Sequence, residues 1–134
     1  MRLYHFTTKL DGEKIIHDGL NRGAIIFPQR PIIQPVIWLT QDSRFNAQHW
    51  ATNNLGVCGD RTEIRLAVEL PNDNKLFRWN LYAKHNLNIN SESLRFFNEG
   101  GGSDGEAWWI YLGILSKKCV IEMIAKPCLI GIGR

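Results

Sequence analysis

The chain has 134 residues, a length typical of one domain built around one hydrophobic core. Hydrophobic residues make up 44% of it and charged residues 22%, which excludes a disordered chain, and no apolar run approaches the ~20 residues that cross a bilayer. The net charge is +3 and the Lys and Arg residues are scattered, so nucleic acid is a compatible partner that the charge does not require. No secretory segment begins the sequence, so we expect a cytoplasmic protein without a membrane partner.

The cysteine and histidine spacings give no metal site. Three cysteines are an odd number without CxxC spacing, which argues against both a disulfide framework and a zinc site. Three histidines fall on helical patterns without metal-ligand spacing, namely His17, His49 and His85. We therefore expect a protein without a bound metal.

The first 35 residues predict a strand, a helix and a loop. Residues 2–7 alternate as a strand does, and Thr8 can cap a helix with apolar positions at Leu10, Ile15 and Ile16. Gly19 fits the stop of that helix. Residues 21–35 contain three prolines among isoleucines, which predicts an irregular apolar loop able to fold over a ligand.

The remaining chain predicts further strands and helices. Residues 36–40 read as a strand, and Asp42 or Ser43 can cap a helix that reaches about Leu55. Strand-like alternation in residues 62–70 turns Ile64, Leu66, Val68 and Leu70 inward. One or two helices are expected in residues 77–98, with core contacts at Phe77, Leu81, Leu87, Leu94 and Phe97. A glycine-rich loop at 100–105 precedes strands at 106–112, 120–124 and 129–132.

This order favours an α+β fold in a single domain spanning residues 1–134, because the C-terminal strands have no helices between them. No GxGxxG turn follows a predicted strand, and the sequence contains no GxxxxGK[ST] loop, so a nucleotide would have to be bound in another way.

Four residues carry the candidate chemistry. His5 lies near the end of the first strand, where its ring can donate a hydrogen bond to a ribose hydroxyl, although a structural histidine is the commoner case. Trp38 can stack on a flat heterocycle or fill a core. Glu106 begins an aromatic strand, where a carboxylate could face positive charge developing on a substrate, or could simply be solvated. Arg65 could pair with a pyrophosphate, or with Glu63 or Glu69.

Three short motifs together resemble a known family. The sequences Leu3-Tyr4-His5-Phe6-Thr7, Val36-Ile37-Trp38-Leu39-Thr40 and Glu106-Ala107-Trp108-Trp109-Ile110-Tyr111 are similar to the His, aromatic and Glu strands of the ADP-ribosyltransferase-like superfamily. The first two motifs are similar to strands of small bacterial members such as the rifampicin ADP-ribosyltransferases. The third motif is similar to the strand that carries the catalytic acid in the poly(ADP-ribose) polymerases.

The resemblance implies a split, strongly bent, mixed β-sheet with flanking short helices that grips NAD as co-substrate. His5 would hold a ribose hydroxyl, Thr7 would orient the nicotinamide side, and Trp38 would stack on nicotinamide. Glu106 would stabilise the oxocarbenium-like state formed as nicotinamide leaves. The expected catalytic residues are thus Glu106 and His5, and the expected cofactor-binding residues are His5, Phe6, Thr7, Trp38, Thr40 and Arg65.

The acid and the acceptor stay open. The Glu106 motif is one residue out of register with the polymerase pattern, which leaves Asp73, Asp104 and Glu69 as alternative acids. The acceptor could be a protein, a nucleic acid or a small molecule, and the small size suits a toxin or defence effector. A nucleotide-binding module or inhibitor without turnover is the main alternative. An RNA-processing or nuclease-like toxin using His5 and Glu106 as an acid–base pair is a further one.

Overall fold

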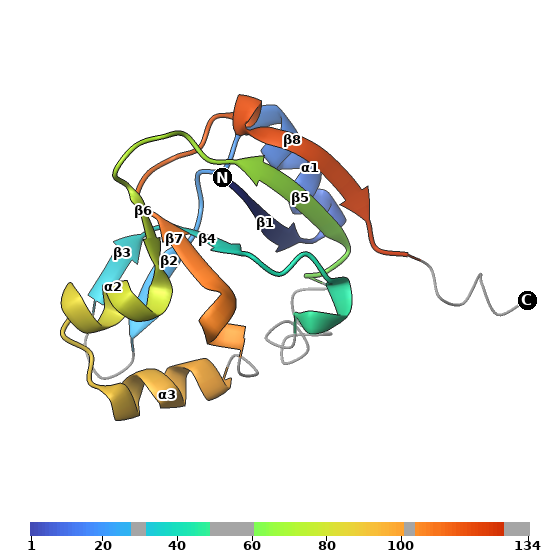
Figure 1. Ribbon diagram of the computed structural model, residues 1–134. Coiled ribbons are helices and arrows are strands. Elements are labelled where there is room, and N and C mark those ends of the chain that lie inside the picture. Colours follow the sequence, from blue (N-terminus) through green and yellow to red (C-terminus); the bar gives the residue numbers. More distant parts are fainter. Residues whose placement is uncertain (28–31, 49–60, 101–103, 128–134) are drawn as a thin grey trace, which may run out of the picture.

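The structure is a computed structural model that describes residues 1–27, 32–48, 61–100 and 104–127. A six-stranded sheet runs in the order β6-β7-β4-β1-β5-β8, beside a two-stranded sheet of β2 and β3 (Figure 1). The strands are β1 (Arg2–Thr7), β2 (Ala24–Phe27), β3 (Ile32–Pro35), β4 (Ile37–Thr40), β5 (Ile64–Glu69), β6 (Leu76–Arg78), β7 (Trp108–Tyr111) and β8 (Val120–Ala125). The helices are α1 (Lys9–Asp18), α2 (Trp79–His85) and α3 (Ser91–Gly100), with 3₁₀ turns η1 (Phe45–Ala47), η3 (Asp104–Ala107) and η4 (Lys117–Cys119).

These elements confirm the α+β class. The pairings within the six-stranded sheet are all antiparallel among the described residues, whereas the resemblance implied a mixed sheet. Between β1 and β4 the chain forms α1 and then the β2–β3 hairpin, and β4 enters the sheet antiparallel to β1.

Helix α1 begins and ends where the sequence predicts. The Thr8 hydroxyl accepts a hydrogen bond from Asp11 N at 3.1 Å, and Gly19 ends the helix with a φ of 84°. A Cβ atom at Gly19 would lie 2.6 Å from the Leu115 carbonyl oxygen, so no other residue fits this stop. Of the three apolar positions, Ile15 packs against the core, while Leu10 and Ile16 are exposed. Helix α1 instead approaches the sheet closely at a glycine, Gly12.

Three other predicted segments differ from the structure. The predicted loop at 21–35 contains the β2–β3 hairpin, since Pro35 stands at the end of a strand, where a missing N–H is tolerated. Residues 76–78 form a strand rather than the start of a helix, and Leu81 is exposed on α2. The short turn η1 follows Asp42, and the rest of the predicted helix, from residue 49, lies outside the described residues, as does the strand at 129–132.

Two buried clusters cover the two faces of the β4–β7 pair. One includes Leu3, Leu20, Leu39, Leu66 and Tyr111, together with other residues of the α1 side. The second lies under α2 and α3, where Trp79 and Ile110 are fully buried. Alternate residues of β7 therefore face different clusters, which explains why this strand is apolar almost throughout.

Strands β1 and β4 are paired over a much shorter length than β1 and β5. Strand β1 pairs with β5 through six residues, from Arg2 to Thr7, but with β4 through the single pair Tyr4 and Thr40. Figure 1 shows β1, β5 and β8 on one side of this point and β4, β7 and β6 on the other. The sheet therefore divides beside the C-terminal half of β1, the half that carries His5 and Thr7.

A buried tyrosine ties β7 to the turn before β6, and it predicts a pH dependence of stability. The Tyr111 hydroxyl donates to Asp73 Oδ2 at 2.7 Å, and burial together with this bond raises the pKa of Tyr111 to about 12 from 10.0. The hydrogen bond from Tyr111, then that from Lys75 N, lowers the pKa of Asp73. A raised folded pKa contributes stability that is full below pH 10 and is lost as the pH rises toward 12. The lowered pKa of Asp73 contributes stability that is lost as the pH falls through its folded value.

Replacing Tyr111 with phenylalanine should lower the free energy of unfolding at pH 7 by about 1–2 kcal/mol. It should also remove the extra loss of stability of the wild type between pH 10 and about 12. Urea denaturation at pH 7, 10 and 11.5 measures both effects. Parallel pH profiles for the two proteins would show that the hydroxyl does not contribute in this way.

Candidate functional site

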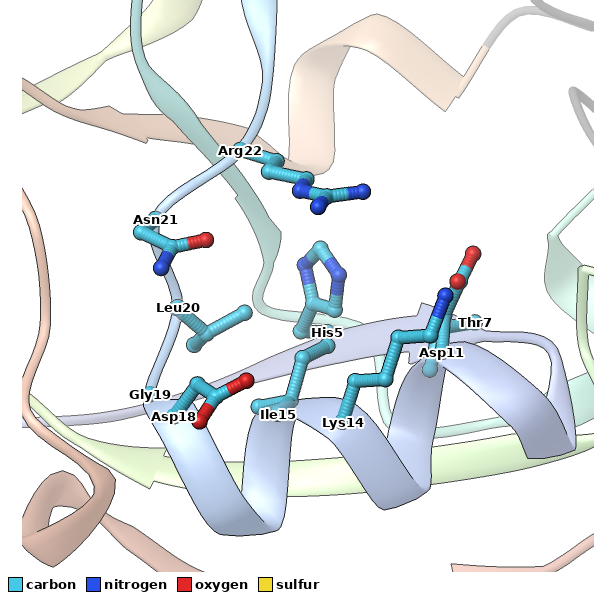
Figure 2. A pocket seen from close by; sticks show the side chains of 10 residues that line it. All are labelled: His5, Thr7, Asp11, Lys14, Ile15, Asp18, Gly19, Leu20, Asn21 and Arg22. Carbon is cyan, nitrogen blue, oxygen red and sulfur yellow. The ribbon is translucent and has the colours of Figure 1, made fainter.

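A cavity of about 210 Å³ opens between β1, α1 and the segment that follows α1 (Figure 2). Strand β1 contributes His5 and Thr7 to its wall. Helix α1 contributes Asp11, Lys14, Ile15 and Asp18, and the following segment contributes Gly19, Leu20, Asn21 and Arg22. Figure 2 shows the His5 ring projecting from β1 toward the side of the cavity that Asn21 and Arg22 form.

The segment after α1 is held against the sheet by backbone hydrogen bonds. Leu20 and Leu115 exchange bonds of 2.8 and 2.9 Å, and Val36 N donates to Gly23 O at 3.1 Å. These bonds are formed by residues on either side of Asn21 and Arg22. The position of Arg22 beside the cavity is therefore fixed by long-range contacts rather than by α1 alone.

His5 bridges the point where β1 and β4 separate. Its Nδ1 lies 2.9 Å from the carbonyl oxygen of Trp38, and because a carbonyl only accepts, Nδ1 carries the proton. Burial lowers the pKa of His5, while this hydrogen bond and the negative charge of Asp11 raise it less. The ring is therefore neutral at pH 7, and its Nε2 is a hydrogen-bond acceptor. The sequence predicted that the His5 ring donates to a ribose hydroxyl, and this direction is wrong, because the ring proton on Nδ1 already bonds Trp38 O. A hydroxyl at Nε2 would have to donate, and Nε2 would accept.

The charges on the cavity wall are balanced. Asp11 and Asp18 supply two carboxylates, and Lys14 and Arg22 supply two cations. Within the part of the chain that the structure describes, no ion pair joins Lys14 or Arg22 to a carboxylate. The cations are thus able to bind an anionic group, and Ile15 and Leu20 provide apolar wall beside them.

Trp38 lies apart from this cavity. Its ring packs edge-on against Trp79 at 4.9 Å and Trp108 at 5.6 Å, beside the cluster under α2 and α3. Trp38 contributes to the cavity through its backbone carbonyl, which accepts a hydrogen bond from His5 and so orients the His5 ring. The predicted stacking of its indole on nicotinamide stays a prediction.

Phe6, Thr40 and Arg65 belong to a second group, around residues 42–45. Phe6 is buried and packs edge-on against Phe45 at 5.3 Å, and the Thr40 hydroxyl accepts from Asp42 N at 3.1 Å. None of the three lines the described cavity. The structure thus brings His5 and Thr7 together and places the other predicted cofactor-binding residues elsewhere.

Arg65 is held within the protein by several contacts. Its guanidinium lies 5.3 Å from the Tyr4 ring centroid and 5.5 Å from that of Phe45, and Nη1 donates to Ser43 O at 2.9 Å. Its Nη2 is 3.4 Å from a carboxylate oxygen of Glu122, whereas the sequence offered Glu63 or Glu69 as partners. Glu69 instead pairs with the N-terminal amine at 2.8 Å, and Glu63 accepts from Lys9 N.

Glu106 is exposed on η3, at the end of β4. Gln41 N donates to Ala107 O at 3.0 Å, and Arg78 donates to the Glu106 carbonyl at 3.4 Å, so the backbone here is well held. The side chain does not line the described cavity. Among the alternative acids, Asp73 accepts from Tyr111 and Glu69 binds the N-terminus.

Several cavity residues were missed from the sequence, above all Asn21, Arg22 and Asp11. Asp11 and Lys14 are three residues apart and so share a helical face, which was a usable signal. The direction that the chain takes after Gly19 depends on the Leu20–Leu115 bridge, which sequence spacing does not reveal.

Comparisons with known proteins found no match: no family model, no curated protein and no solved structure matches the chain. No α-helix in the described ranges is both long and apolar enough to cross a membrane.

Proposed function

We propose that this protein is an NAD-dependent ADP-ribosyltransferase, which transfers ADP-ribose to a protein, nucleic acid or small-molecule acceptor. The observation that carries the proposal is the state of His5. Its Nδ1 is engaged by Trp38 O at the division of the sheet, and its neutral Nε2 is left for a ligand in the cavity. The division itself agrees with the split sheet that the family resemblance implies.

The cavity chemistry suits the ribose of a nucleotide. A neutral Nε2 and the Asp11 carboxylate are two acceptors, and a ribose diol supplies two hydroxyl donors. The Thr7 hydroxyl can accept or donate, and the apolar atoms of Ile15 and Leu20 can contact a sugar or base face. We assign His5 and Asp11 to the diol, with Thr7 beside them.

The two cations suit a pyrophosphate. The planar guanidinium of Arg22 can donate two parallel hydrogen bonds to phosphate oxygens, and Lys14 can add a point charge. A volume of about 210 Å³ is below the roughly 300–1,000 Å³ typical of complete small-molecule sites. The cavity would therefore hold part of the dinucleotide, and the nicotinamide half would extend toward the division between β1 and β4.

In the chemical step, the bond between nicotinamide and its ribose breaks and nicotinamide leaves with the electron pair. The acceptor nucleophile then bonds to the same anomeric carbon, so a carboxylate near the developing positive charge accelerates the reaction. Glu106 is the proposed carboxylate. Its segment lies beside the end of β4, next to the pair that Tyr4 and Thr40 form.

A nucleotide-binding module without turnover is the second candidate. It is favoured by one observation, that Glu106 is exposed and does not line the described cavity with His5. The two candidates share the ligand, and they differ in whether nicotinamide is released.

The assignment of Arg22 is tested by calorimetric binding of NAD and of adenosine. Replacing Arg22 with alanine should weaken NAD binding about tenfold, since one charge-assisted contact to phosphate is lost. Adenosine has no pyrophosphate, so its affinity should change little. Replacing Arg2, at the far end of β1 and outside the cavity, is the matched control. Equal losses for NAD and adenosine would contradict this placement of the pyrophosphate, and absence of NAD binding to the wild type would contradict the proposed function.

A further inference from the structure

The outer edge of β8 is an exposed strand edge with apolar side chains. Strand β8 ends the sheet order, and among the described residues only β5 pairs with it. Ile121 and Met123 are each 46% exposed and Ile124 is 37% exposed. Such an edge presents free backbone donors and acceptors and is a template for another strand. We propose that it pairs with the same edge of a second copy of this chain, in a two-fold symmetric antiparallel dimer.

Backbone direction decides which residues of β8 can bond outward. Lys126 N donates to Glu63 O at 2.7 Å, and the register continues with Ile124 opposite Arg65 and Glu122 opposite Ala67. Because backbone groups in a strand alternate in direction, residues 122, 124 and 126 bond toward β5. Met123 and Ala125 therefore direct their N–H and C=O groups outward.

Charge selects one register of the dimer. A two-fold axis beside Ile124 places Met123 opposite Ala125 of the second copy. The outward N–H and C=O groups of these two residues can then form hydrogen bonds between the copies. The same axis places Glu122 opposite Lys126 of the second copy, twice by symmetry. An axis beside Glu122 would instead oppose two carboxylates, and one beside Met123 would leave both charges opposite apolar residues.

Both charged side chains already have contacts within one copy, and the dimer pairs would form beside them. The Glu122 side chain is 44% exposed, and its contact with Arg65 at 3.4 Å uses one carboxylate oxygen. The Lys126 ammonium donates to Thr62 Oγ1 at 3.1 Å within one copy. Pro127 lacks an N–H, so the shared ladder is short and we expect a weak, reversible dimer.

Charge reversal tests the register by sedimentation equilibrium over a wide range of concentrations. The wild type should self-associate reversibly, and Glu122→Lys or Lys126→Glu alone should each weaken the dimer about tenfold, because two attractive pairs become repulsive. The double variant restores both pairs and should recover the wild-type affinity. Glu13→Lys on α1 and Lys84→Glu on α2 are exposed controls with the same charge changes. A wild type that stays monomeric throughout, or a double variant weaker than both single ones, would overturn the proposal.

Cross-linking tests the axis independently, in a background where the three native cysteines are serine. In this register Ile124 lies opposite Ile124 of the second copy, and the two residues form a non-hydrogen-bonded pair. Their Cα atoms would be about 4.5 Å apart, which is within disulfide range. Oxidation by glutathione should therefore cross-link Ile124→Cys readily. The neighbouring Met123→Cys, opposite Ala125, should cross-link poorly. Equal yields from the two variants, or a higher yield from Met123→Cys, would contradict the register.

Discussion

Replacing His5 with asparagine is expected to weaken NAD binding about a hundredfold while leaving the fold intact. The asparagine amide can take the place of Nδ1 and donate to Trp38 O, whose bond to His5 is 2.9 Å. It has no group at the place of Nε2, so the acceptor for the ribose hydroxyl is lost and a buried polar contact goes unmade. Calorimetric titration with NAD, beside thermal unfolding, separates the two roles.

The control is His85→Asn, in the last turn of α2, where the side chain is exposed. If His5 were only structural, His5→Asn would keep both stability and NAD affinity. A His5→Ala variant would then lose stability through the unbonded Trp38 carbonyl. Unchanged NAD affinity in a stable His5→Asn protein would therefore remove His5 from the binding site.

Replacing Trp79 with alanine is expected to cost about 3–5 kcal/mol of unfolding free energy. The Trp79 side chain is fully buried and contacts Trp38, and its Nε1 donates to Asn98 Oδ1 at 3.1 Å. The substitution leaves a cavity under α2 and α3 and an unpaired amide oxygen on Asn98. It also removes one neighbour of Trp38, the residue whose carbonyl orients His5.

Urea denaturation measures this loss, with Trp109→Ala as the matched control. Trp109 is half-buried on β7, its Nε1 donates to Gln41, and its removal should cost about 1–2 kcal/mol. A loss for Trp79→Ala no larger than that for Trp109→Ala would contradict the assignment of Trp79 to a packed core.

The local elements were the predictable part of this fold. Thr8 and Gly19 mark the two ends of α1 through side-chain capping and a positive φ, both of which are properties of single residues. Strands β1 and β5 follow from the alternation of side chains along residues 2–7 and 62–70. The β2–β3 hairpin was missed because its prolines indicate a loop unless they fall at strand ends, which depends on the pairing.

The site was predictable only in part. His5 and Thr7 stood out because a histidine and a hydroxyl side chain at a strand end are within reach of a ligand. The role of Trp38 depends on which rings surround it, and Trp79 and Trp108 come from segments far away in the sequence. Arg22 reaches the cavity because Leu20 pairs with Leu115, a contact that spacing does not encode.

The most direct test of ADP-ribosyltransferase activity is nicotinamide release from NAD by the purified protein, with cell lysate supplied as a source of acceptors. We expect release by the wild type, loss of release in His5→Ala, and loss of release in Glu106→Gln with NAD affinity largely kept. Release that survives Glu106→Gln would assign the acid to another carboxylate. NAD binding without any release would favour the binding module, and a wild type that neither binds NAD nor releases nicotinamide would contradict the proposed function.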